Sequence, residues 1–144
     1  MATEKKIVKA EEAAAITTAT PDFNIPEGYI CTLDMTTNEG KIKVATALNG
    51  SEPLKNYVNK VIELVGIVTT PGTRAVSGND CTNNYLILAD GKVLFSQSDG
   101  VARSLKVITA LWGAELQAGK VVKVKCIEQT LNNGNTLKSV VPAV

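Results

Sequence analysis

Two pairs of lysines stand at alternate positions, a spacing that would present positive charge on one face of a strand. Lys123 and Lys125 alternate with apolar residues, and Lys41 and Lys43 do the same nearer the N-terminus. Such a face attracts phosphate groups, although lysines on a strand also serve simply to keep an edge soluble. The further candidates for phosphate contact are Arg74 and Lys92. A binding site requires these charges to converge around one groove.

Aromatic side chains supply the second kind of binding chemistry, because a base stacked on a ring contributes about 1–3 kcal/mol whatever its identity. The chain has two Phe, three Tyr and one Trp. Tyr85 and Phe95 fall in neighbouring predicted strands, but periodicity leaves open whether their faces point into the core or outward. Trp112 lies on an apolar helical stripe and is predicted to belong to the core.

Catalysis has little support in the sequence. There is no histidine, so the commonest general base and transition-metal ligand is missing, and the acidic residues are scattered. No phosphate-binding loop, dinucleotide fingerprint or nucleophile elbow occurs. The three cysteines are too far apart for a metal-binding pair, and their odd number suits a reducing compartment. We therefore expect a protein that is not an enzyme and that uses no metal or cofactor.

The elements that must position these residues follow a definite order. Two turn signals, Asp90-Gly91 and Asn133-Gly134, each close a predicted strand pair, and the first is predicted to be a type I′ turn. Gly66 predicts a bulge in the long first strand. The predicted elements are a strand at 60–70, a polar loop at 70–83, strands at 84–89 and 92–98, a helix from 101 that ends at Gly113, and strands at 121–129 and 135–141. The order strand–strand–strand–helix–strand–strand predicts a mainly β fold, a five-stranded OB-fold barrel.

The N-terminal part differs in composition. Residues 1–27 combine a charged, alanine-rich segment with a proline-containing one, and we interpret them as an arm or linker. Alternation then predicts two strands, 29–36 and 41–48, so that an added β-hairpin at 28–49 precedes the barrel. Residues 28–144 would form one OB-fold domain that includes this hairpin.

Overall composition points to a soluble protein. Hydrophobic residues make up 44% and the formal net charge is +1, so attraction to phosphate would depend on local clustering. The longest uncharged apolar run, 64–68, is far too short to span a bilayer, and the first residues lack the features of a secretory signal. We expect a cytoplasmic location and no membrane association.

Several short stretches carry a resemblance to a known family. They are ALNGSEPL, KVIELVGIV, NYLILADGKVLFSQSDGVARSL, LWG, KVVKVKCIEQ and NGNTLKSVV, which together run from residue 47 to residue 141. This part of the chain resembles the small single-stranded DNA-binding proteins of bacteriophages of Gram-positive hosts. The resemblance implies an OB-fold protein that coats single-stranded DNA in phage replication or recombination. The acidic, phenylalanine-terminated tail with which bacterial single-strand binders recruit partners is absent from the C-terminus.

We therefore expect a sequence-tolerant single-stranded DNA-binding protein. Its phosphate contacts would come from the lysines and Arg74, and its stacking from Tyr85 and Phe95. Replication or recombination proteins and a second copy of the chain are further possible partners. The main alternative is a non-catalytic structural or protein-interaction OB module, such as a small virion component or adaptor. An oligosaccharide-binding domain and a metal-dependent enzyme are weaker alternatives.

Overall fold

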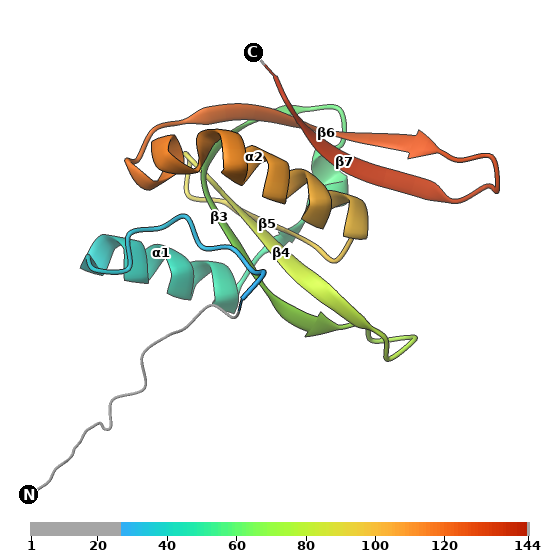
Figure 1. Cartoon of the computed structure of the whole chain (residues 1–144), viewed down its shortest axis with the longest axis horizontal. Coiled ribbons are helices and arrows are strands. Elements are labelled where there is room, and N and C mark those ends of the chain that lie inside the picture. The colour runs from blue at the N-terminus through green and yellow to red at the C-terminus, as the bar shows by residue number, and fades with distance from the viewer. Residues whose placement is uncertain (1–26, 144) are drawn as a thin grey trace, which may run out of the picture.

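The computed structural model describes residues 27–143, which form a mixed α/β fold (Figure 1). Six strands build one curled, half-barrel sheet in the order β2-β5-β4-β3-β6-β7. Two helices lie on opposite faces of it, and one of them falls between strands β5 and β6 in the chain. The elements are α1 (Asn38–Asn49), β2 (Glu52–Pro53), the 3-10 helix η2 (Leu54–Tyr57), β3 (Val61–Thr73), β4 (Asp80–Leu88), β5 (Val93–Ser96), α2 (Asp99–Gln117), β6 (Val122–Thr130) and β7 (Thr136–Pro142).

From residue 61 onward, the predicted succession of three strands, one helix and two strands is confirmed. The predicted closed barrel is wrong, because β7 pairs only with β6, and β5 pairs only with β4 and β2. Helix α2 takes up the free edge of β7 instead: the Val140 N–H donates to Ser104 Oγ at 3.0 Å. Gly100, in the first turn of α2, has no room for a side chain because it lies against the Lys138 carbonyl. A helix packed this closely leaves the sheet open between β2 and β7.

The main core lies between the inner face of the sheet and α2. Val101, Leu105 and Ile108 form the predicted apolar stripe of the helix and are fully or almost fully buried. Trp112 only packs against this core and remains partly exposed. The predicted helix end at Gly113 is wrong, since α2 continues to Gln117 and buries Leu116. A helical glycine costs about 1 kcal/mol, and burial of one leucine, worth about 1.5–3 kcal/mol, offsets that cost.

The predicted N-terminal hairpin is wrong, because residues 38–49 form helix α1. Thr37 caps the helix by accepting a hydrogen bond from the Gly40 N–H, and the buried positions are Gly40, Val44 and Ala47, which lie on one helical face. With Leu33, the last two join a second apolar cluster on the outer face of the sheet. Before the helix, the chain runs beside β3, where the Thr32 N–H donates to the Ile67 carbonyl at 3.0 Å and the Thr69 N–H to the Ile30 carbonyl at 2.8 Å. The predicted arm at 1–27 falls almost wholly outside the described residues.

The predicted loop at 70–83 is also wrong, because most of it is paired strand. Residues Thr70–Thr73 of β3 pair with Asp80–Asn83 of β4, and only residues 74–79 turn between them. Figure 1 shows this ribbon projecting beyond the helices, as the β6–β7 ribbon also does. None of the residues 70–73 and 80–83 belongs to either apolar cluster, so this ribbon lacks the alternation of apolar and polar residues by which a strand is predicted. The predicted bulge is confirmed, since the β3–β4 register shifts between Leu64 and Gly66.

Two of the turns share one geometry. Gly91 and Gly134 have φ of +93° and +86°, and their N–H groups donate to the carbonyls of Leu88 and Leu131, each at 3.0 Å. Among described non-glycine residues only Asn59 has a positive φ, so the type I′ turn predicted at Asp90-Gly91 is wrong. The turn is instead followed by a left-handed glycine, the arrangement of a three-residue hairpin loop.

No helix among residues 27–143 is both long and apolar enough to cross a membrane.

Candidate nucleic-acid interface

The outer face of β3, β4 and β5 carries successive cross-strand rows of side chains. In the central row Val68, Tyr85 and Phe95 are register partners. The rings of Tyr85 and Phe95 lie 5.2 Å apart between centroids, with a 50° angle between their planes. Both rings are partly exposed, and only Tyr85 packs against the apolar cluster beneath α1. The two aromatic residues selected from the sequence therefore form one platform on the outside of the sheet.

One neighbouring row is apolar and covered. Ile87 pairs with Gly66 on one side and Val93 on the other, and both Ile87 and Val93 are buried beneath α1 and Leu33. A side chain at position 66 would overlap Leu33. The covered row marks one boundary of the aromatic platform and holds its strands against α1.

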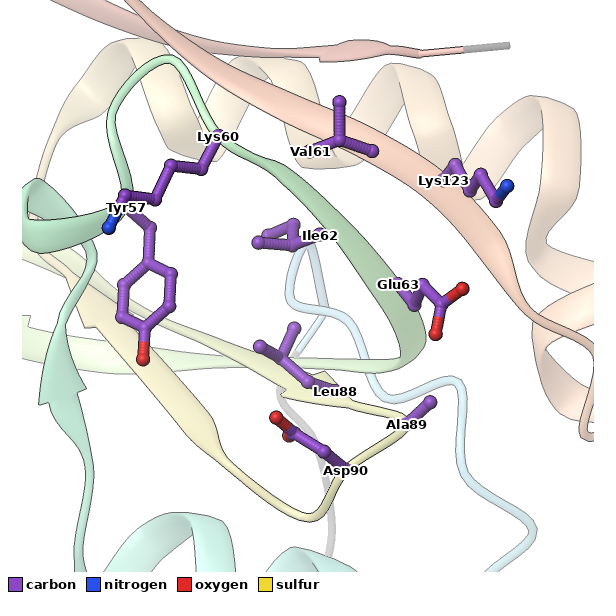
Figure 2. Close-up of a pocket in the computed structure, with 9 residues that line it drawn as sticks. All are labelled: Tyr57, Lys60, Val61, Ile62, Glu63, Leu88, Ala89, Asp90 and Lys123. Atoms are coloured by element: carbon purple, nitrogen blue, oxygen red, sulfur yellow. The ribbon is translucent and has the colours of Figure 1, made fainter.

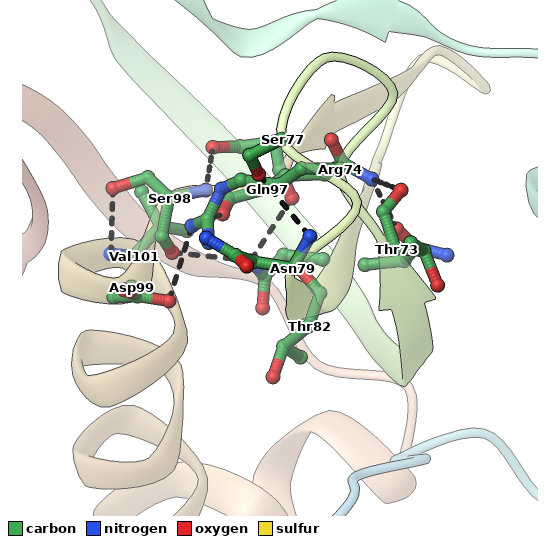
Figure 3. A network of polar contacts seen from close by, with 12 residues as sticks. Thr73, Arg74, Ser77, Asn79, Thr82, Gln97, Ser98, Asp99 and Val101 are labelled. Atoms are coloured by element: carbon green, nitrogen blue, oxygen red, sulfur yellow. Dashed lines mark hydrogen bonds and ion pairs between the residues drawn. The ribbon is translucent and has the colours of Figure 1, made fainter.

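The row on the other side is polar, and Figure 3 shows its surroundings. Gln97 Nε2 donates to Asn83 Oδ1 at 2.9 Å and to the Thr73 carbonyl at 3.4 Å. Asn83 Nδ2 lies 3.5 Å from the Pro71 carbonyl. Two half-buried amides therefore sit directly beside Tyr85 and Phe95 on the same face of the sheet.

Arg74 closes the end of this region but is not free. Its Nη2 donates to the Gln97 carbonyl at 2.9 Å and pairs with Asp99 Oδ1 at 3.3 Å (Figure 3). The guanidinium thus ties the β3–β4 turn to the start of α2, where the Val101 N–H donates to the capping hydroxyl of Ser98. Because Asp99 offsets its charge, Arg74 contributes less attraction for phosphate than an unpaired arginine would.

Lys92 lies at the opposite end of β5, close to other polar groups. The Tyr57 hydroxyl, hydrogen-bonded to the Lys92 side chain, is the largest cause that raises the pKa of this ammonium, and Asp90 and Glu52 add to it. The same hydroxyl donates to Glu52 Oε1 at 3.3 Å. Lys92 therefore remains charged through the neutral range, but it faces carboxylates rather than an open cationic surface.

Lys123 and Lys125 lie on β6, where they are the register partners of Glu63 and Val61. A recess of about 410 Å³ opens beside Lys123, and Figure 2 shows Lys123 and Glu63 on one wall with Lys60 and Asp90 across from them. The recess is lined by two basic and two acidic residues, Lys60, Lys123, Glu63 and Asp90, so its charge is balanced.

Lys41 and Lys43 project from α1 rather than from a strand. Lys43 pairs with Glu39 at 3.5 Å, one helical turn away, and Lys41 is exposed. Lys43 also lines a recess of about 320 Å³ between α1 and the β4–β5 turn, together with the exposed Ile42. The buried Ile87–Val93 row therefore lies between Lys43 and the aromatic platform.

The predicted site is thus brought together only in part. Tyr85 and Phe95 are adjacent, while the selected cations are spread over α1, two turns and β6, and three of them face carboxylates: Lys43, Arg74 and Lys92. Asn83 and Gln97 were missed as site residues. Their spacing could have indicated them, since Asn83 lies two positions before Tyr85 and Gln97 two positions after Phe95. That the two amides contact each other follows only from the pairing of β4 with β5. Among residues 27–143 no group of three Cys, Asp or Glu side chains could hold a metal ion.

Comparison with known proteins found no matching family model, no matching curated protein and no matching solved structure.

Proposed function

We propose that this chain binds single-stranded nucleic acid, with single-stranded DNA as its ligand, and that it does so without catalysis. The observation that carries the proposal is the partly exposed Tyr85–Phe95 pair on the outer face of β4 and β5. Strands 2 and 3 of an OB-fold use this face for oligonucleotides. We further propose that the half barrel is an open form of the OB-fold, in which α2 occupies the position where closing strands would pair.

Stacking contributes most of the affinity in this proposal. Two rings in one row can support neighbouring bases, at about 1–3 kcal/mol each. The phosphates are contacted by lysines of α1, which packs on the outer face of the sheet, and of β6, a strand of the sheet itself. Since carboxylates lie close to several cations, we expect a weaker salt dependence than a binding groove lined only with lysines would give.

The proposed role is to coat single-stranded DNA during phage replication or recombination. It rests on the family resemblance of residues 47–141 together with the aromatic platform. A sequence-tolerant platform suits coating because every base has a face that can stack.

A protein-interaction module is the second candidate, and one observation favours it. Val107 and Leu111 lie one turn apart on the solvent side of α2 and are 59% and 63% exposed. Apolar residues grouped on a helix face are typical of surfaces that bind other proteins. Self-association without affinity for DNA would support this candidate.

The test is an anisotropy titration of a fluorescein-labelled oligo-dT at two salt concentrations, with duplex DNA for comparison. We expect binding to the single strand that weakens with salt and little binding to the duplex. The double variant Tyr85→Ala/Phe95→Ala should lose about tenfold or more in affinity, since two stacking contacts are removed. The matched control Tyr85→Phe/Phe95→Tyr keeps both rings and should bind nearly as the wild type does. Absence of binding to oligo-dT at low salt would contradict the proposal.

A further inference from the structure

The two amides beside the aromatic platform have a fixed orientation. The Thr73 carbonyl can only accept a hydrogen bond, so the Gln97 amide must present its nitrogen there. That same nitrogen faces Asn83, which must therefore present its oxygen to Gln97, at 2.9 Å. The Asn83 nitrogen is then left beside the Pro71 carbonyl, which again can only accept. Main-chain carbonyls at both ends thus determine which way each amide points.

Fixed orientation leaves a defined set of unused groups. Among the described residues no hydrogen bond reaches Gln97 Oε1, and one hydrogen of Asn83 Nδ2 remains free of the contact with Pro71. The pair therefore offers one acceptor and one donor on the partly exposed outer face. A nucleobase edge carries neighbouring donors and acceptors, which is why asparagine and glutamine pair with bases elsewhere.

The orientation of the Asn83 amide also depends on a glycine in the neighbouring strand. Gly72 lies on β3 opposite Cys81, and a side chain at position 72 would overlap the amide group of Asn83, whose Cγ would lie 2.6 Å from the new carbon. The φ of Gly72 is not in the left-handed region, so alanine suits the backbone there and would act only by displacing Asn83. Gly72 thus allows the Asn83 amide to lie across β3.

From this arrangement we propose that Asn83 and Gln97 recognise the hydrogen-bonding edges of bases whose faces stack on Tyr85 and Phe95. The inference rests on the proposed function and adds to it a polar contact with the bases themselves, separate from stacking and from phosphate contact. A base above Phe95 extends its edge toward Gln97, because the two side chains are successive on the same face of one chain segment. The difference in affinity of the wild type between a strand with bases and an abasic strand would therefore exceed what stacking alone contributes.

The experiment is a cycle that combines protein variants with modified strands. Wild type and Asn83→Ala/Gln97→Ala are titrated with oligo-dT and with a strand of equal length whose bases are replaced by abasic sites. We expect the double variant to bind oligo-dT roughly tenfold more weakly, as the loss of one or two hydrogen bonds implies, and to bind the abasic strand as the wild type does. Gln129→Ala removes an exposed amide of β6 and serves as the matched control, with no expected change on either strand.

A second variant separates recognition from a structural role. Gly72→Ala keeps both amides but displaces Asn83, so it should weaken binding to oligo-dT in the same direction while leaving the abasic strand unaffected. Equal losses on both strands, or an unchanged affinity of both variants for oligo-dT, would overturn this inference while the proposed function stands. If the wild type failed to bind oligo-dT at all, the proposed function would fall and this inference with it.

Discussion

Residues 41–48 and 121–129 carry nearly the same pattern, in which lysines alternate with small or branched apolar residues, yet one is a helix and the other a strand. In β6, Val122, Val124 and Cys126 all face the main core, two residues apart. In α1, Val44 is buried while Ile42, two residues earlier, is 64% exposed. Burial therefore follows a period of two in one segment and of about 3.6 in the other.

The difference lies outside the alternating residues themselves. Thr37 accepts a hydrogen bond from the Gly40 N–H and starts α1. In β6, pairing with β3 on one side and β7 on the other satisfies the backbone groups along the strand. Short alternating segments therefore do not specify a strand unless partner strands are available on their edges.

The largest effect should come from charging the buried face of β6. Val122→Asp and Val124→Asp should each lower the free energy of unfolding by about 4 kcal/mol, because each places an unpaired carboxylate in the core. Urea denaturation measures both values. Lys123→Gln, between the two valines but exposed, is the control and should change stability little. If only one of the two valines proved sensitive, the strand assignment would be in error.

Aspartate substitutions in α1 should lower the free energy of unfolding at Val44 but not at Ile42, two residues earlier. Val44→Asp should lower the free energy of unfolding by about 3 kcal/mol, since Val44 is 3% exposed and packs in the smaller cluster. Ile42→Asp should change it by less than about 0.5 kcal/mol because that side chain is mostly in solvent. The same urea titration compares them. Similar losses at both positions would restore the strand interpretation.

The two lysine pairs should also differ in binding. Lys123→Ala/Lys125→Ala should weaken binding to oligo-dT several-fold at low salt for every sequence, and should reduce the salt slope by about 1.4, since each phosphate contact on a single strand contributes about 0.7. Lys41→Ala/Lys43→Ala should have a smaller effect, because Glu39 already pairs with Lys43. Titrations at four salt concentrations give both slopes. Binding by the β6 variant that equals the wild type would make that face purely structural.

The smallest effect concerns the signal that starts the helix. Thr37→Ala should cost about 1 kcal/mol of stability, as the loss of a helix cap commonly does. Thr46→Ala, on the exposed side of the same helix, is the matched control and should be neutral. Thermal unfolding of the two variants provides the comparison. A neutral result at Thr37 would mean that packing of Val44 and Ala47 alone holds α1.

Parts of the candidate site were accessible from sequence to different degrees. Tyr85 and Phe95 could be selected because each lies in a strand next to one turn, but alternation leaves the outward face undetermined. Only the packing of α1 on one side and α2 on the other decides that Leu86 is buried in the main core and that Tyr85 faces outward. The Asn83–Gln97 pair depends on contact between strands whose members are 14 residues apart.

The sequence by itself determined the order of elements from residue 61 onward, because apolar periodicity, the bulge glycine and the two turn glycines are local signals. Tertiary structure decided that β7 bonds to α2 instead of closing a barrel and that the cations are dispersed among carboxylates. These features depend on which distant surfaces meet. Residues 38–49 became a helix through the local Thr37 cap together with the packing of Val44 and Ala47 on the sheet. Local preferences amount to tenths of a kcal/mol per residue, whereas burial of one apolar side chain amounts to about 1.5–3 kcal/mol, so packing overrides them.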